Sequence, residues 1–176
     1  MSNLSDFIGG RMVRKFQLLT SGSSATWALP TNLLGDTVWV SAIAGGEAYN
    51  STGPVYGQGG SYIQQYPYTA SSDVTYTVGA GGSGTAGANG TDTVWGTITL
   101  QGGGEADCSG AIGRNSTGGA LAETPPGPFG SGPAVGNTLN KGGGGLMLNG
   151  TLYGNGGTSS ADGGGGAILL EWWEKA

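Results

Sequence analysis

The segment from Tyr76 to Gly96 reads YTVGAGGSGTAGANGTDTVWG and is the most informative part of the sequence. It starts as a threonine-rich extended segment, passes through glycine from Gly79 to Gly90, and resumes as an extended segment at Thr93. Glycine loses more conformational entropy on folding than any other residue. A glycine run that is ordered in a folded chain therefore needs many backbone hydrogen bonds to hold it.

Similar glycine clusters recur along the chain, at residues 45–46, 57–60, 102–104, 142–145, 154–157 and 163–166. Three interpretations compete: flexible linkers, loops that need positive φ, and runs packed against one another. In the packed form each run is a left-handed extended helix with three residues per turn, whose N–H and C=O groups all point outward. The clusters abut aromatic or β-branched segments, which linkers seldom do, so the pattern favours packed runs resembling polyglycine II.

The composition is that of one folded domain with an unusual backbone. Glycine supplies 40 of 176 residues, but it follows no strict Gly-X-Y period and proline supplies only 7, so a collagen helix is excluded. The chain is 10% charged and 9% aromatic, whereas disordered chains are typically rich in charge and poor in aromatic residues. We therefore expect a buried core.

Segments rich in Val, Ile, Thr, Tyr and Trp predict β-strands, and no helix of ordinary length is predicted. The expected strands are KFQLLTSG (15–22), SATWALP (24–30), DTVWVSAIAGG (36–46), SYIQQYPYT (61–69), DVTYTVGA (73–80), TDTVWGTITL (91–100) and AILLEWWEK (167–175). The five tryptophans, Trp27, Trp39, Trp95, Trp172 and Trp173, are expected in the core or at a subunit interface. The fold class is all-β.

Several function classes are disfavoured by what the sequence lacks. A net charge of −5 argues against nucleic-acid binding, which needs clustered Lys and Arg. The chain has no His and a single cysteine, Cys108, so a zinc set or a histidine-containing triad is not expected, and neither is a cofactor. No apolar run approaches the roughly 18 residues of a membrane span, so membrane insertion is not expected either.

The order of several motifs carries a family resemblance. ATWALP, VWVSAIAGG, GQGGSY, YTVGAGGSG, NGTDTVWGTITLQGGG and GGGGAILLEW resemble, in this order, the glycine-rich domain at the distal end of bacteriophage and prophage tail fibre proteins. The resemblance spans roughly residues 16 to 173. The opening SDFIGG also looks like short segments that precede such domains in phage tail proteins.

The resemblance implies a fold, partners and a location. The fold is a β-sandwich of jelly-roll type over residues 16–176, similar in outline to homotrimers of the tumour-necrosis-factor type, with the glycine runs packed against it. Residues 1–15 are expected to attach to other phage tail proteins, with Leu4, Phe7 and Ile8 as the apolar contacts. The protein is then made in the bacterial host cytoplasm and resides in the virion tail.

The expected activity is binding of the host cell surface during adsorption, to a glycan or an outer-membrane protein. Aromatic side chains give large contact area at low entropic cost, and loops on a rigid scaffold concentrate recognition residues. The candidates beside glycine or proline turns are Tyr49, Tyr56, Tyr66, Tyr68, Phe129 and Tyr153. Each of them can instead simply cover a sheet face.

Two other functions stay open. The first is a structural virion component that joins tail proteins without touching a receptor. The second is a polysaccharide depolymerase, which needs two carboxylates about 5 to 9.5 Å apart. Asp92, Glu105 and Asp107 are candidates, but acidic residues in glycine-rich turns more often cap backbone N–H groups, so an enzyme is not expected.

Overall fold

The computed structural model describes residues 12–49, 57–104, 145–157 and 162–175. In this part of the chain every regular element is a β-strand, so the all-β prediction is confirmed. The strands are β1 (Met12–Leu19), β2 (Ala25–Trp27), β3 (Thr37–Ile43), β4 (Tyr62–Thr69), β5 (Val74–Thr77), β6 (Thr93–Trp95), β7 (Ile98–Leu100), β8 (Leu146–Leu148), β9 (Thr151–Tyr153) and β10 (Ala167–Lys175).

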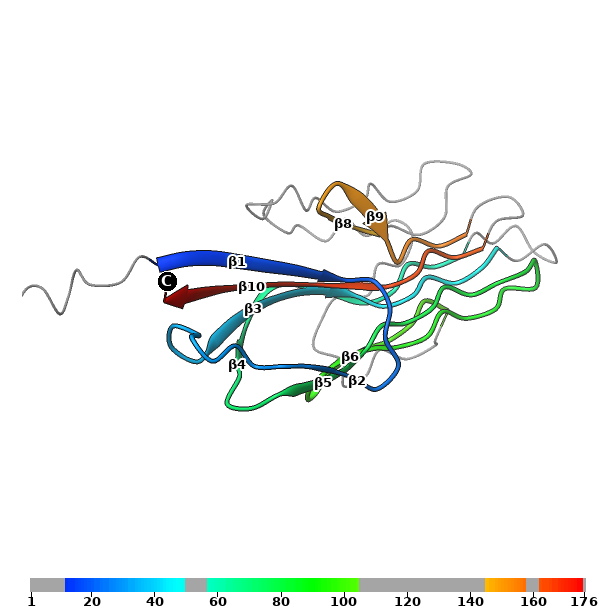
Figure 1. Cartoon of the computed structure of the whole chain (residues 1–176). Coiled ribbons are helices and arrows are strands. Elements are labelled where there is room, and N and C mark those ends of the chain that lie inside the picture. Colours follow the sequence, from blue (N-terminus) through cyan, green and yellow to red (C-terminus); the bar gives the residue numbers. More distant parts are fainter. Residues whose placement is uncertain (1–11, 50–56, 105–144, 158–161, 176) are drawn as a thin grey trace, which may run out of the picture.

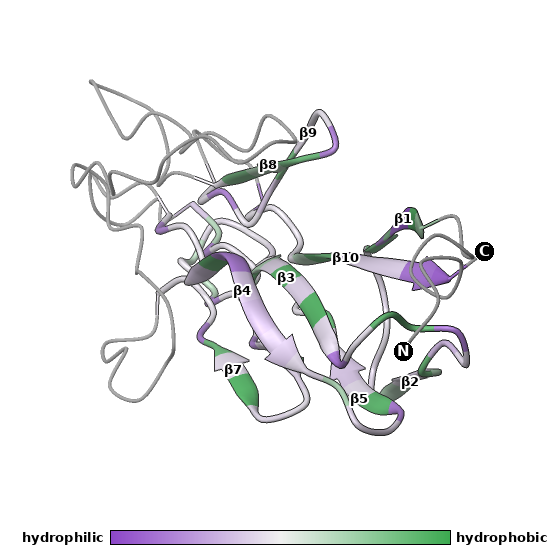
Figure 2. Cartoon of the chain, turned by 90° about the vertical axis from the view of Figure 1, so that its left-hand side faces the viewer, coloured by the Kyte–Doolittle hydropathy of each residue, from purple (hydrophilic) through white to green (hydrophobic). Residues whose placement is uncertain are grey.

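Sheet 1 contains four antiparallel strands in the order β1-β10-β3-β4. The pairing of Met12 with Lys175 brings both described ends of the chain together at one end of this sheet (Figure 1). In β3 the buried Val38 and Val40 alternate with Thr37, Trp39 and Ser41, which Figure 2 shows as a change of colour along the strand. Strand β4 lies at one edge, where Pro67 can lack an N–H without breaking the ladder.

Sheet 2 contains the four shorter strands β2-β5-β6-β7, also antiparallel. It shares one hydrophobic core with sheet 1, to which Val38, Val40 and Leu170 contribute from sheet 1. Trp27 stands at the centre of this core, with its ring 5.5 Å from that of Trp95 and 5.6 Å from that of Trp172. Three of the five tryptophans are therefore in the core, as predicted, and the jelly-roll connectivity stays a prediction.

A separate hairpin, β8-β9, covers part of the other face of sheet 1 (Figure 1). Side chains alternate across a strand, so Ile168 and Leu170 face the main core while Ala167 and Leu169 face this hairpin. Leu146 and Leu148 of β8 are almost completely buried against them. The chain thus forms three layers in this region: sheet 2, sheet 1 and the hairpin.

The structure corrects some sequence-based expectations. The segment from residue 91 to 100 is not one strand but two, because Gly96, with φ of 56°, starts a turn that brings Trp95 opposite Ile98. The hairpin β8-β9 was not expected at all, although Asn149 and Gly150 at its turn both have positive φ, as a type I′ turn requires. β1 starts at Met12, so residues 12–15 pair in sheet 1, whereas the expected strand began at Lys15. The division of the chain at residue 16 stays a prediction.

Two tryptophans lie outside the core. Trp39 is 37% exposed and Trp173 is 40% exposed. Both lie on the face of sheet 1 that points away from sheet 2, because each is adjacent in sequence to a core-facing residue and successive side chains of a strand point to opposite faces.

Candidate functional site

Glycine runs extend beyond the sheets, away from the end where Met12 pairs with Lys175 (Figure 1). Each run continues a strand: residues 44–48 follow β3, residues 79–82 follow β5, residues 101–104 follow β7, and residues 154–157 follow β9. Three returning runs, residues 57–61, 88–91 and 163–166, lead into β4, β6 and β10. We call these seven segments the glycine bundle.

The run of residues 44–48 lies at the centre of the glycine bundle. Its successive N–H groups donate to carbonyl groups of three different runs. Ala44 donates to Ser61 and Glu47 to Gln58, both in the run of residues 57–61. Gly45 donates to Thr91 and Ala48 to Ala88 in the run of residues 88–91, and Gly46 donates to Gly164. Residues three apart therefore donate to the same neighbour, which is the periodicity of a helix with three residues per turn. This central run has the geometry predicted for packed glycine.

The carbonyl groups of the central run bind three further neighbours. Gly45, Gly46 and Glu47 accept hydrogen bonds from the N–H groups of Gly103, Gly82 and Gly157, with N···O distances of 2.7, 2.8 and 2.7 Å. With three donor and three acceptor directions, the central run bonds to all six other runs. This is a hexagonal arrangement around a buried centre, in which Ala44 and Ala48 have no exposed surface.

The six outer runs also bond to one another and close a ring. Their links, in order around the ring, are Ser61 N to Gln101 O, Gly90 N to Gly103 O, Thr91 N to Ala80 O, Gly163 N to Gly82 O, Gly154 N to Gly165 O, and Gly60 N to Gly154 O, all between 2.8 and 3.0 Å. Because the runs are tied to the centre and to each other, the bundle forms a rigid extension of the sheets.

Glycine is required for this packing. A Cβ atom placed on Gly45, Gly81 or Gly82 would come closer than 3.0 Å to a carbonyl oxygen of a neighbouring run. Real Cβ atoms essentially never make such contacts. The glycine clusters with these residues are therefore structural parts of the bundle and not linkers.

The bundle ends in a tip, where the run of residues 79–82 turns back through residues 83–87. The tip comprises Tyr49, residues 83–87 and Asp162, together with Gly104, where the chain leaves the described region. Two hydrogen bonds connect the turn at residues 83–87 to its neighbours, from Gly84 N to an Asp162 carboxylate oxygen at 2.8 Å and from Gly87 N to Tyr49 O at 3.1 Å. Ser83, Thr85 and Ala86 are exposed there. The tip can present polar groups and small side chains to a large partner.

The predicted receptor-binding residues are dispersed. Tyr49 is half-buried at the tip. Tyr66 and Tyr68 lie on β4 and Tyr153 on β9, where they are half-buried and pack against the hydrophobic clusters, with the Tyr68 ring 6.0 Å from that of Trp95. Tyr56, Phe129 and the predicted attachment residues Leu4, Phe7 and Ile8 lie outside the described residues. The roles assigned to all of these residues stay predictions.

The carboxylates considered for catalysis have other surroundings where they are described. Asp92 accepts a hydrogen bond from the backbone N–H of Gly102 at 3.0 Å, which is a structural cap inside the bundle. Glu105 and Asp107 lie outside the described residues. Within residues 12–49, 57–104, 145–157 and 162–175, no group of three or more acidic, His or Cys side chains is placed to hold a metal ion.

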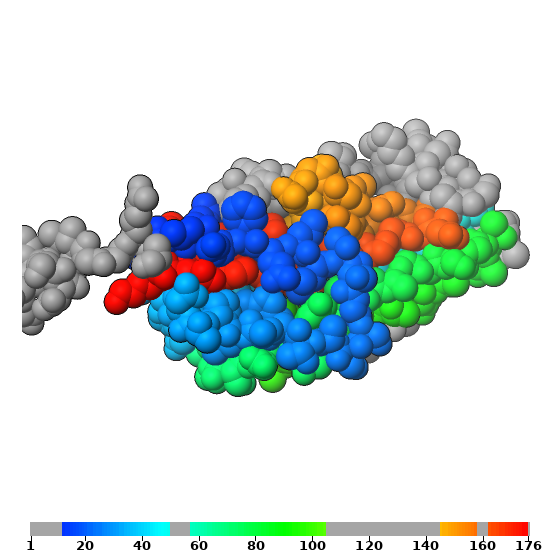
Figure 3. All heavy atoms as spheres, in the orientation of Figure 1, coloured from blue at the N-terminus to red at the C-terminus, as the bar shows by residue number. Residues whose placement is uncertain are grey.

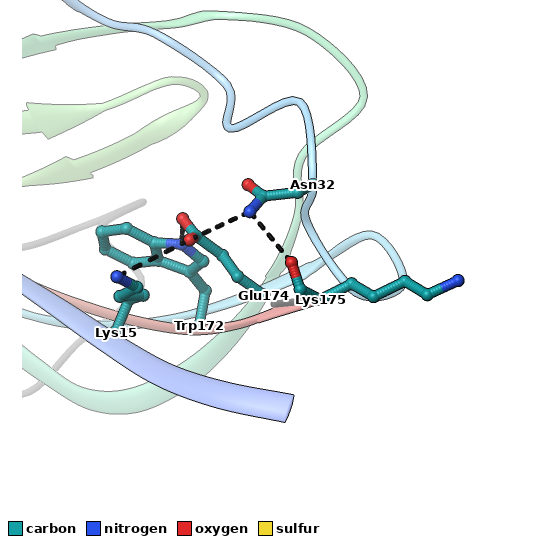
Figure 4. A network of polar contacts seen from close by, with 5 residues as sticks. All are labelled: Lys15, Asn32, Trp172, Glu174 and Lys175. Carbon is teal, nitrogen blue, oxygen red and sulfur yellow. Dashed lines mark hydrogen bonds and ion pairs between the residues drawn. The ribbon is translucent and has the colours of Figure 1, made fainter. Parts of the chain in front are cut away.

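The opposite end of the molecule is fastened by a polar network (Figure 4). Glu174 on β10 accepts hydrogen bonds from the Trp172 indole at 2.8 Å and from the Asn32 amide at 3.3 Å, and lies 3.9 Å from the Lys15 ammonium. The Asn32 amide also donates to the carbonyl of Lys175. Strand β1, strand β10 and the turn at Asn32 are thus held together where the described ends of the chain meet.

The sequence did not indicate that the tip would be built from residues 83–87. Ser83 and Thr85 interrupt the glycine run, and this pattern could have predicted a turn there, because such residues favour turns. In the described part of the chain, no helix is long and apolar enough to span a membrane. No protein-family model matches the chain, and a search of curated proteins finds no match.

Proposed function

We propose that this protein is the tip component of a bacteriophage tail fibre and binds the host cell surface with the end of its glycine bundle. The observation that carries the proposal is that the described chain termini and the tip of the glycine bundle lie at opposite ends of the molecule. The described chain termini pair at one end of sheet 1, and the turn at residues 83–87 lies at the far end of the glycine bundle. A protein that joins a fibre through its terminal segment then projects its turns away from the fibre.

The bundle suits this role because it separates support from recognition. Its runs are held by backbone hydrogen bonds, and the turn at residues 83–87 carries exposed side chains. Binding residues are generally found on loops that a rigid scaffold positions. The order of the sequence motifs, which resembles that of tail fibre tips, supports the same function.

The proposed partners follow from this orientation. The N-terminal segment that contains Leu4, Phe7 and Ile8 attaches to other tail proteins, and the tip contacts a glycan or an outer-membrane protein of the host. Three copies assemble on the virion, as the resemblance implies. The proposed activity is binding without catalysis.

The test is a cell-binding assay with matched tip and control variants. The amount of fluorescently labelled protein that binds to susceptible bacteria is measured. Unlabelled protein is also tested for its ability to reduce phage adsorption. Thr85→Arg places a long charged side chain at the exposed tip, whereas Thr99→Arg makes the same change at the exposed position of β7 in sheet 2. We expect Thr85→Arg to reduce binding at least about tenfold and Thr99→Arg to leave it unchanged, because interface energy is concentrated in few contacts.

Two outcomes would contradict the proposal. One is native protein that neither binds susceptible cells nor competes with phage. The other is equal binding by the two variants, which would place recognition away from the tip. Protein that stays on the fibre but has no effect on adsorption would indicate a purely structural virion component.

A further inference from the structure

Large hydrophobic side chains are exposed on one face of sheet 1. Among the described residues seven such side chains are exposed, and five of them lie on the face that points away from sheet 2: Met12, Phe16, Leu34, Trp39 and Trp173. The hairpin β8-β9 covers the part of this face nearer the bundle, and no other described strand covers the part near the described termini. We call this open part the terminal face.

The strand register arranges these side chains in two neighbouring rows. Phe16, Glu171 and Trp39 lie opposite one another across β1, β10 and β3. Arg14 lies opposite Trp173 in the next row, and the N–H of Leu34 donates to the carbonyl of Trp173 at 2.8 Å. The Arg14 guanidinium forms an ion pair with Glu171 between the rows, and this hydrogen bond raises the pKa of Arg14 above its ordinary value. The polar groups in the middle of the face are therefore already paired.

The exposed area corresponds to the centre of a protein interface. The five side chains are between 37% and 65% exposed. With a full area of about 150–250 Å² for a large side chain, they expose together roughly 500 Å². An interface of standard size buries about 800 Å² per partner, with an apolar centre and a polar rim.

A cavity at the edge of the terminal face limits what kind of partner fits. It has a volume of about 170 Å³ and is lined by Phe16, Leu18, Leu169 and Asn149 of the hairpin turn. Sites for small-molecule ligands generally have volumes of about 300–1,000 Å³. The cavity is therefore suited to a single apolar side chain from a protein partner.

We propose that the terminal face is the surface through which copies of this chain associate. The same face carries protruding apolar side chains and a cavity that accepts one, so it is complementary to itself. The chain has a net charge of −5, but this face carries two cations, Arg14 and Lys175, against one carboxylate, Glu171. Glu171 is already compensated by its ion pair with Arg14, so two acidic chains can meet here without opposing unpaired carboxylates.

The position of the face agrees with an assembly of parallel copies. β1 and β10 lie on the surface beside the hairpin and run along the long direction of the molecule (Figure 3). Copies that share this face around a common axis can direct all their tips the same way. The inference deepens the proposed function by naming the contact between copies, but it is tested separately.

The experiment measures the molar mass of the purified full chain by size-exclusion chromatography with light scattering, over a wide dilution series. The test variant is Phe16→Glu, which places a charge on the terminal face at a side chain that is 65% exposed. The control is Leu152→Glu on β9, where the side chain is 40% exposed on the hairpin and does not belong to the terminal face. Thermal unfolding of each variant verifies that it is folded.

We expect the native chain and Leu152→Glu to have the mass of an oligomer. We expect the Phe16→Glu oligomer to dissociate at protein concentrations at least about thirtyfold higher than the native oligomer does, which corresponds to the loss of one interface hot spot. Trp173→Glu provides a second test should Phe16→Glu fail to fold. A native chain that is monomeric at every concentration would overturn the inference. So would a folded test variant whose mass equals that of the native chain. Cell binding by a monomeric native chain would leave the proposed function standing while removing this interface.

Discussion

Single glycines in the bundle differ in what they tolerate, even within one run. A Cβ on Gly163 would come closer than 3.0 Å to the carbonyl oxygen of Gly46 in the central run. Two residues later, Gly165 is exposed, has no atom within 4 Å of the same position, and does not adopt positive φ. The sequence GGGG over residues 163–166 does not distinguish these positions, because the neighbours that crowd them come from distant parts of the chain.

This contrast predicts the effects of two alanine substitutions. Gly163→Ala is expected to lower the free energy of unfolding by about 1–3 kcal/mol, the usual cost of overpacking a tight interior. Gly165→Ala is expected to change it by less than about 0.5 kcal/mol, as exposed substitutions generally do. Denaturant unfolding followed by tryptophan fluorescence measures both values. Equal stability of the two variants would mean that the run at residues 163–166 is not packed against the central run.

At the scale of elements, long alternating segments were predictable and short turns were not. β3, β4 and β10 were expected from their β-branched and aromatic residues, and they form most of sheet 1. β6 and β7 merged into one predicted strand, because only the two residues Gly96 and Thr97 separate two segments with the same composition. In such places the hydrogen-bonded partner decides where a strand ends.

Thr93 of β6 connects the sheets to the glycine bundle. Its side chain is buried, and its hydroxyl donates to the carbonyl of Ile43 and accepts from the N–H of Gly79, both at 2.9 Å. Ile43 ends β3 just before the central run, and Gly79 begins an outer run. A single hydroxyl thus satisfies two backbone groups where three elements meet.

Replacing this hydroxyl by a methyl group tests the connection. Thr93→Val keeps the shape of the side chain but leaves a buried N–H and a buried C=O without this partner, so we expect a loss of about 1–3 kcal/mol in the free energy of unfolding. Thr99→Val makes the same change at an exposed site on β7 and is expected to be nearly neutral. The denaturation midpoints of the two variants give the comparison. A shift no larger for Thr93→Val than for Thr99→Val would show that these hydrogen bonds contribute little.

At the scale of the whole molecule, the existence of packed glycine was predictable but its arrangement was not. Composition and the adjacent strands indicated ordered runs. The choice of residues 44–48 as the centre depends on six neighbours from distant positions. The same limit applied to the candidate site: Tyr49 was selected for its aromatic ring, while the exposed turn at residues 83–87 was seen only as glycine-rich. No local pattern specifies which runs become neighbours.

The hexagonal arrangement predicts an unusual sensitivity to chain length. One glycine inserted between Gly45 and Gly46 rotates the following N–H groups by about 120°, because the run has three residues per turn. The hydrogen bonds that Gly46, Glu47 and Ala48 donate would then point at the wrong neighbours. One glycine inserted between Gly84 and Thr85 lengthens only an exposed turn at the tip. We therefore expect the first insertion to lower the Tm strongly or prevent folding, and the second to leave the Tm within a few degrees of the native value. Thermal unfolding by circular dichroism measures both, and equal Tm values would mean that the order around the central run does not support the fold.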